Sequence, residues 1–86
     1  MKYAIKKGVL WQEVDGEIVI VAPKQDPMYL NESGSVVWKL IDSGLGETKI
    51  VDKITGDYEV DRKTIEKDVK TIIADLIKNK CIELKK

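Results

Sequence analysis

Apolar and polar positions divide the chain into a β-prone first third and a helical remainder. Residues 9–14 and 17–22 are two apolar, β-branched runs separated by Asp15-Gly16. An Asp-Gly pair between such runs predicts a hairpin, because both central positions of the tight turn need positive φ. Pro23 ends the second strand, since proline cannot donate to a sheet ladder. Residues 28–30 predict a very short third strand at the edge of the sheet.

From Asn31 onward the apolar residues recur at helical spacing. Asn31 is a good N-cap for a first helix that contains Trp38 as a core residue, and Gly44 stands where a glycine ends helices. A second helix is predicted over residues 48–56. Asp61 is the predicted cap of a third helix over residues 62–80, which has the clearest apolar face: Ile65, Val69, Ile72, Ile73, Leu76 and Ile77. Residues 82 and 84 predict a short tail that packs back on the domain.

Three strands followed by three helices indicate an α+β fold. A small antiparallel sheet has to cover its apolar face with helices. The inventory is that of a winged helix-turn-helix-like domain, with a three-stranded antiparallel sheet followed by three helices. A length of 86 residues suits one domain over residues 1–86.

Charge argues against nucleic acid as the partner. Fifteen basic residues balance fifteen acidic ones, and residues 1–43 carry five lysines against six acids. A nucleic-acid-binding domain usually has a clear basic excess. No apolar run is long enough for a membrane span, and residues 1–7 are not followed by an apolar stretch of signal-peptide length. A single cysteine, Cys81, fits a reducing compartment, so we expect a cytoplasmic protein.

The residue inventory also excludes most catalytic chemistry. The chain has no histidine and one cysteine, which removes Ser–His and Cys–His nucleophiles and the usual zinc ligand sets. Gly44-Leu45-Gly46 is too short for a phosphate loop. The carboxylates are scattered along helices, as expected of a solvated face. We therefore expect a binding module that is not an enzyme and that needs no cofactor or metal.

One stretch of sequence carries a family resemblance. Leu30-Asn31, Gly34 and Val37-Trp38 follow one another with the spacing of the PqqD-like family, whose members recognise the leader segments of ribosomally synthesised precursor peptides. Thr48 with Ile50-Val51 resembles the family's second helix, and Asp68-Val69 with Leu76 resembles its third. The resemblance covers about residues 17–84.

The resemblance implies a mechanism. The leader peptide adds as a strand to the edge of the third strand, and the third helix forms the other wall of the groove. The residues that this assigns to peptide binding are Pro27, Met28, Tyr29, Leu30, Asp68, Thr71, Ile72, Asp75 and Leu76. The implied partners are the precursor peptide and a separate modifying enzyme, which is a leader peptidase with a cyclase in lasso-peptide pathways, or a radical S-adenosylmethionine enzyme in PQQ and thioether pathways. The Leu-Asn-x-x-Gly-x-x-x-Trp form favours the lasso-type relatives.

Plainer interpretations stand beside this one. A lysine stripe on the third helix is typical of a solvated face, although it also keeps a winged-helix DNA-binding protein open as the alternative function. Asp68 and Asp75 fit an ordinary polar margin of that helix as well as a groove wall, and Ile72 and Leu76 fit a core role. Trp11, together with the edge strand, could instead pair two chains.

Overall fold

The computed structural model describes residues 2–85. In chain order the elements are β1 (Lys2–Ile5), β2 (Leu10–Val14), β3 (Glu17–Val21), β4 (Met28–Tyr29), α1 (Glu32–Asp42), α2 (Glu47–Asp57), α3 (Arg62–Lys78) and β5 (Ile82–Lys85). The predicted α+β class is confirmed, since an antiparallel three-stranded sheet is followed by three helices. The predicted helix over 62–80 is two residues too long, because α3 ends at Lys78.

The three-stranded sheet has the order β2-β3-β4. The β2–β3 hairpin turns at Asp15 and Gly16, whose φ angles of 52° and 85° are the positive values that the Asp-Gly pair predicted. β3 pairs on its other side with β4, with Val19 opposite Tyr29 and Ile20 opposite Met28. β4 is therefore an outer strand of the sheet, as the sequence indicated.

The helix ends follow local chemistry at two of the three predicted positions. Asn31 caps α1, and its Oδ1 accepts the Gly34 N–H at 2.8 Å. Gly44 follows the end of α1 with a φ of +90°, a conformation that favours glycine. Asp61 occupies the N-cap position of α3 but caps no backbone N–H; its Oδ2 accepts the Thr64 hydroxyl instead.

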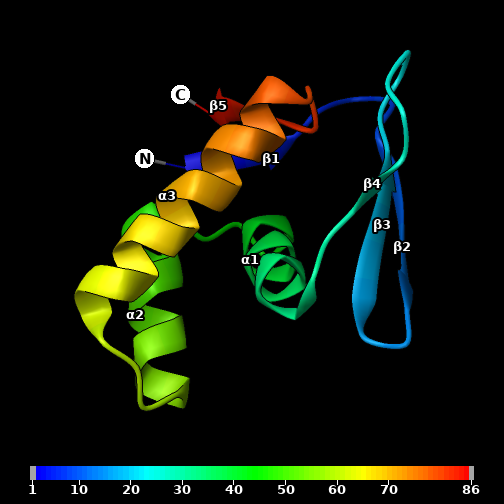
Figure 1. Ribbon diagram of the computed structural model, residues 1–86. Helices are drawn as coiled ribbons and strands as arrows, with labels where there is room; N and C mark the ends of the chain where they lie inside the picture. The colour runs from blue at the N-terminus through cyan, green and yellow to red at the C-terminus, as the bar shows by residue number, and fades with distance from the viewer. Residues whose placement is uncertain (1, 86) are drawn as a thin grey trace.

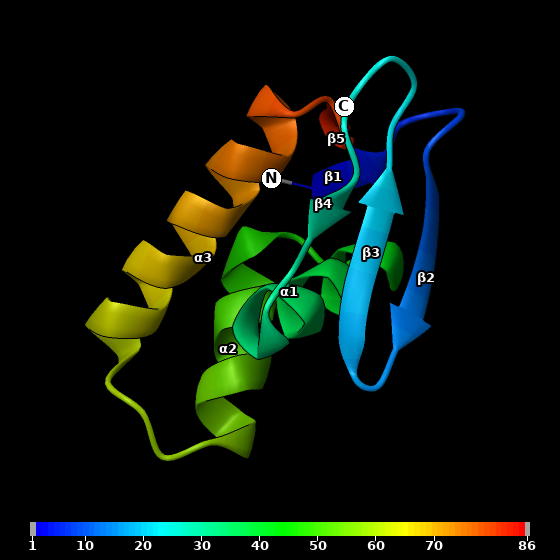
Figure 2. The same cartoon turned by 45° about the vertical axis from the view of Figure 1, so that its right-hand side comes forward.

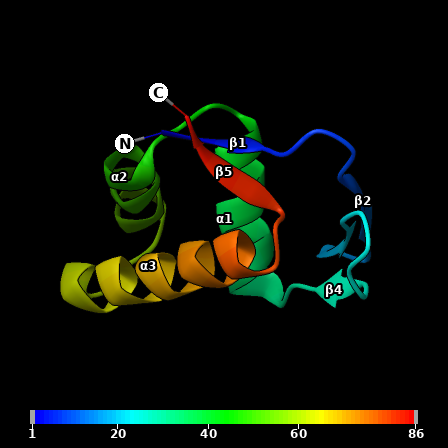
Figure 3. The same cartoon turned by 90° about the horizontal axis from the view of Figure 1, so that it is seen from above.

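A second, two-stranded sheet was not predicted. β1 and β5 pair antiparallel with Lys2 opposite Lys85 and Ile5 opposite Ile82. The tail after α3 does pack back, as expected, and Ile82 is buried. The two strands are separated by almost the whole chain, so no local pattern indicates their pairing. Figure 3 shows β1 and β5 crossing each other over α1, on the side away from β4.

α1 is the central element of the core. It packs on β3 and β1 and also contacts α2 and α3, and Figures 1 and 2 show it between the three-stranded sheet and the α2–α3 pair. Trp38, on α1, is fully buried, which confirms its predicted core role. Trp11 on β2 packs edge to face against it, with ring centroids 6.0 Å apart, and remains about one-third exposed (37%).

Candidate functional site

The outer edge of β4 offers backbone hydrogen-bonding groups. The Leu30 N–H donates to the Ile18 carbonyl at 2.8 Å, so Ile18 and Leu30 form a hydrogen-bonded pair that extends the ladder past the end of β4. Hydrogen-bonded and non-hydrogen-bonded pairs alternate along an antiparallel ladder. Val19–Tyr29 is thus a non-hydrogen-bonded pair, and the N–H and C=O of Tyr29 point away from β3 to the open edge.

Side chains alternate across this short strand. Met28 is half-buried and Leu30 is buried at 6% exposure, so both face the core. Pro27 is exposed and Tyr29 is 75% exposed. One face of this strand therefore packs on the core, and the other face is exposed.

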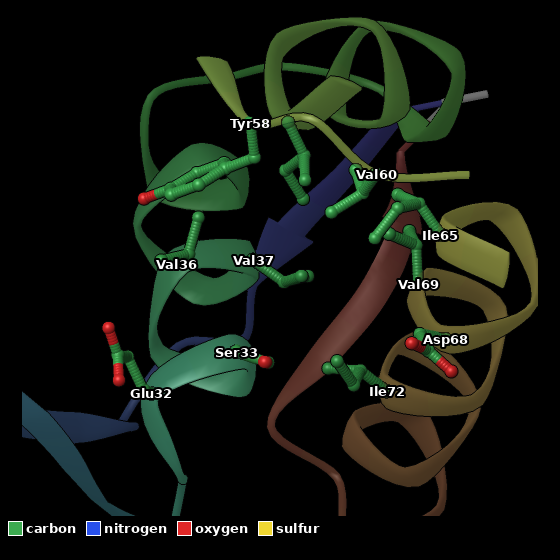
Figure 4. Close-up of a pocket in the computed structure, with 11 residues that line it drawn as sticks. Glu32, Ser33, Val36, Val37, Tyr58, Val60, Ile65, Asp68, Val69 and Ile72 are labelled. Atoms are coloured by element: carbon green, nitrogen blue, oxygen red, sulfur yellow. The ribbon is translucent and has the colours of Figure 1, made fainter. Parts of the chain in front are cut away.

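An apolar cavity of about 190 Å³ lies between the start of α1 and α3. Figure 4 shows Val36 and Val37 projecting from α1, Ile65, Val69 and Ile72 from α3, and Tyr58 and Val60 from the segment between α2 and α3. An apolar cavity of about 150 Å³ is large enough to bind benzene. This cavity can therefore receive an apolar side chain from a partner.

Polar groups flank one end of the cavity. Glu32 and Ser33, in the first turn of α1, follow β4 in the chain after only two residues, and Asp68 lies on α3 opposite them (Figure 4). The cavity thus begins where the edge strand ends. A peptide that leaves the edge of β4 over the start of α1 would pass directly over this opening.

The nine residues assigned to peptide binding fall into four groups. Pro27, Met28 and Tyr29 form the edge, and Asp68 and Ile72 line the cavity. Thr71 and Asp75 are exposed on α3, with the Thr71 hydroxyl donating to the Lys67 carbonyl. Leu30 and Leu76 are buried in the core, Leu76 completely, so their side chains are not on the exposed surface.

Sequence reasoning missed most of the cavity lining. It placed no function on the following residues: Glu32, Ser33, Val36, Val37, Ile54, Tyr58, Val60, Ile65 and Val69. The available signal was Tyr58 and Val60, two large apolar residues in a connection between helices, which the structure leaves 55% and 45% exposed. An exposed apolar connection next to an amphipathic helix often marks a binding surface.

The basic residues of α3 share the helix with acidic ones, and the first of them is paired. Arg62 pairs with Asp52 at 2.7 Å and with Glu66 at 3.1 Å. Asp68 and Asp75 share the helix with the lysine stripe. This mixture of charges suits a peptide better than a polyphosphate backbone.

Within residues 2–85, no group of histidine, cysteine and carboxylate side chains is arranged to hold a metal ion. Cys81 is buried, and burial raises the pKa of its thiol, which disfavours the reactive thiolate. Among the same residues, no helix is long and apolar enough to cross a membrane.

Comparison with known proteins gives the family. The model of the coenzyme PQQ synthesis protein D (PqqD) family matches residues 17–82, most of the chain. The chain belongs to the PqqD family. The match begins with β3 and includes β4, all three helices and the first residue of β5. No sequence among the curated proteins matches this chain.

Solved structures extend the PqqD comparison to the whole fold. The chain is similar to TbiB1 in complex with the TbiA(beta) leader peptide, with 30% identity, a TM-score of 0.88, and coverage of 100% of this chain and 99% of that one. It is also similar to a lasso peptide synthetase B1 complexed with a leader peptide (16% identity, TM-score 0.86, 98% and 100% covered). A third similar structure is the PqqD truncation of Methylobacterium extorquens PqqCD, described as a stand-alone recognition element. It has 23% identity and a TM-score of 0.77, with coverage of 95% of this chain and 88% of that one. The last two show the fold alone.

Proposed function

We propose that this chain binds the leader segment of a ribosomally synthesised precursor peptide and presents it to a separate modifying enzyme. The observation that carries this proposal is the open edge of β4, where both backbone groups of Tyr29 point away from the sheet. An added strand gains main-chain hydrogen bonds there and gains specificity from neighbouring pockets. The similarity to leader-bound TbiB1 over the full length of this chain supports the proposal.

The cavity next to the edge is the proposed source of specificity. Asp68 and Ile72 contribute α3's part of its wall, and Thr71 and Asp75 extend the exposed face of the helix beyond it. An apolar leader side chain would be buried in the cavity, and Glu32 and Asp68 would favour a basic residue beside it. Pro27, Met28 and Tyr29 would hold the leader backbone, while Leu30 and Leu76 would act through the packing beneath.

The chain acts in this proposal as one recognition domain over residues 1–86, without catalysis and without a cofactor. The absence of histidine and the buried, protonated Cys81 support a non-catalytic role. Its enzyme partner is a leader peptidase with a cyclase or a radical S-adenosylmethionine enzyme. The Leu-Asn-x-x-Gly-x-x-x-Trp form that begins at Leu30 favours the first. Both partners are cytoplasmic in this scheme.

An amide NMR titration tests the proposal. The probe is a synthetic leader of the precursor peptide encoded beside this gene. Shifts should concentrate at residues 28–30 and along residues 68–76, because these segments carry the edge and the α3 wall. Shifts confined to β1 and β5, or none at micromolar peptide, would show that the leader does not bind at this site.

A further inference from the structure

A buried serine joins the edge strand to the first helix. Ser35 on α1 is 2% exposed. Its Oγ accepts the Ile18 N–H at 2.9 Å and donates to the Leu30 carbonyl at 3.3 Å. In a regular ladder the Ile18 N–H would donate to the Leu30 carbonyl directly, since these residues form a hydrogen-bonded pair. The Ser35 hydroxyl is inserted into this one step of the ladder.

This hydroxyl fixes the direction of the peptide group between Leu30 and Asn31. A trans peptide is planar, with its C=O and N–H pointing in opposite directions, and no cis peptide occurs in residues 2–85. Because the Leu30 carbonyl points inward to Ser35, the Asn31 N–H points outward, to the same open edge as the backbone groups of Tyr29.

The Asn31 N–H is also left without an intramolecular partner. In a capping box, a Glu or Gln side chain three residues after the N-cap takes the N–H of the cap residue. Here that position is Gly34, which offers only its own N–H to the Asn31 side chain. Among residues 2–85 the Asn31 N–H donates no hydrogen bond. With ψ at −178°, Asn31 continues the extended backbone of the strand.

We propose that Ser35 is a positioning residue that aims the Asn31 N–H at the bound peptide, so that the recognition edge extends beyond β4 to Asn31. This inference rests on the proposed strand addition at β4. In a leader peptide that runs antiparallel to β4, one residue lies opposite Tyr29. The Asn31 N–H then donates to the carbonyl of the peptide residue that comes two positions earlier in the leader. The contact lies next to Glu32 and Ser33, and so connects the edge to the cavity.

Hydrogen exchange of the wild-type protein tests the edge directly, with the leader of the precursor encoded beside this gene as the probe. In the free protein, the amides of Ile18 and Leu30 should exchange slowly and those of Tyr29 and Asn31 quickly. Saturation with leader should slow hydrogen exchange at the amides of both Tyr29 and Asn31. Slowing of Tyr29 with no change at Asn31 would overturn the inference and leave strand addition standing. No slowing at either residue would overturn both.

Variants at Ser35 test its role. Ser35→Ala should weaken leader binding about three- to tenfold, the equivalent of one neutral hydrogen bond, and should remove the leader-induced protection of Asn31 while Tyr29 stays protected. Ser35→Thr retains the hydroxyl and should restore the protection. Ser43→Ala is the matched control, because the Ser43 hydroxyl donates only to the Lys39 carbonyl of its own helix.

The readout at Asn31 separates positioning from general stability. A loss of stability alone would lower exchange protection across the core and would not single out one edge amide. If Ser35→Ala binds as tightly as wild type with Asn31 still protected, Ser35 does not position this group. If Ser35→Ala does not fold, the wild-type exchange experiment still decides whether Asn31 contacts the leader.

Discussion

At the scale of single residues, the fold buries two weak acids near the two-stranded sheet. Tyr3 on β1 and Cys81 just before β5 are 9% and 1% exposed. Burial raises the pKa of the Tyr3 phenol, with a further contribution from the charge of Glu47, and burial alone raises the pKa of the Cys81 thiol. In both cases the folded state favours the protonated, neutral form.

The raised pKa of Tyr3 makes stability depend on alkaline pH. Because the folded pKa lies above the ordinary value of 10.0, the contribution of Tyr3 is complete below that value and is lost as pH rises through the folded pKa. We expect the free energy of unfolding to fall more steeply above pH 10 in wild type than in Tyr3→Phe. Denaturant unfolding of both proteins at a series of pH values measures this. Parallel pH curves would contradict it.

Ile72 connects core packing with the cavity wall. It is half-buried and packs against the core while it lines the cavity. Ile72→Ala should weaken leader binding about tenfold, because the lost methylene and methyl groups face the proposed ligand, and should destabilise the fold by about 1–2 kcal/mol. Calorimetric titration and denaturant unfolding measure the two effects.

Ile77→Ala is the matched control for Ile72→Ala. Ile77 lies on the same helix but is 45% exposed and does not line the cavity. Its substitution should leave leader affinity unchanged. Equal losses of affinity in the two variants would mean that the cavity does not contribute to binding.

The sequence could not predict which of the candidate binding residues are exposed and which are buried. Tyr29 and Leu30 are neighbours, yet one is exposed and the other lies in the core, and only the face of the strand decides which. Ile72 and Leu76 belong to one apolar stripe, and only the position of α1 decides that Ile72 borders a cavity and Leu76 does not. The apolar pattern of the sequence therefore gives candidate binding residues, and only the packing of the fold decides which of them face the cavity and which belong to the core.

At the scale of elements, the proposed leader binding at β4 depends on the free backbone groups of the strand more than on the length of the strand. Its two residues pair with β3 on one side only. The Tyr29 N–H faces the open edge, so a proline there breaks no hydrogen bond to β3. Tyr29→Pro should therefore abolish or strongly weaken leader binding, at least tenfold, while the melting temperature changes little.

The matched control is Tyr29→Ala, which removes the exposed ring and keeps the N–H. It separates the backbone from the side chain when both variants are titrated with leader and monitored by thermal unfolding. Equal affinities for wild type and Tyr29→Pro would contradict binding through this edge.

Elements with local signals were predicted, and elements without them were not. The hairpin at Asp15-Gly16, the cap at Asn31 and the apolar stripe of α3 are all encoded within a few residues. The pairing of β1 with β5 joins segments nearly eighty positions apart, each of four residues with lysine or glutamate among them. Such a pairing arises from the packing of Tyr3 and Ile82 on the core, which only the assembled molecule determines.

At the scale of the whole molecule, leader binding should act as a stabilising ligand. A ligand that binds only the folded state at a hundred times its Kd adds about 2.7 kcal/mol to the free energy of unfolding. For a domain of this size that corresponds to a rise of about 10–20 °C in melting temperature. Thermal unfolding with increasing leader measures the shift, and a scrambled leader is the control.

Random duplex DNA in the same thermal experiment separates leader binding from DNA binding. With balanced charge over the chain and acids beside the lysines of α3, DNA at low salt should leave the melting temperature unchanged. Stabilisation by DNA that disappears at higher salt, together with none by the leader, would instead favour the DNA-binding function.

The pairing of β1 with β5 has a consequence for protein engineering. It holds residues 2 and 85 directly opposite each other, and Figure 3 shows β1 and β5 on the side of the molecule away from β4. A short peptide bridge could therefore join residues 2 and 85, and the chain could be opened at the exposed Asp15-Gly16 turn, giving a circular permutant with the same core. By the same geometry, a reporter or an enzyme tethered at either strand would leave the recognition edge unobstructed.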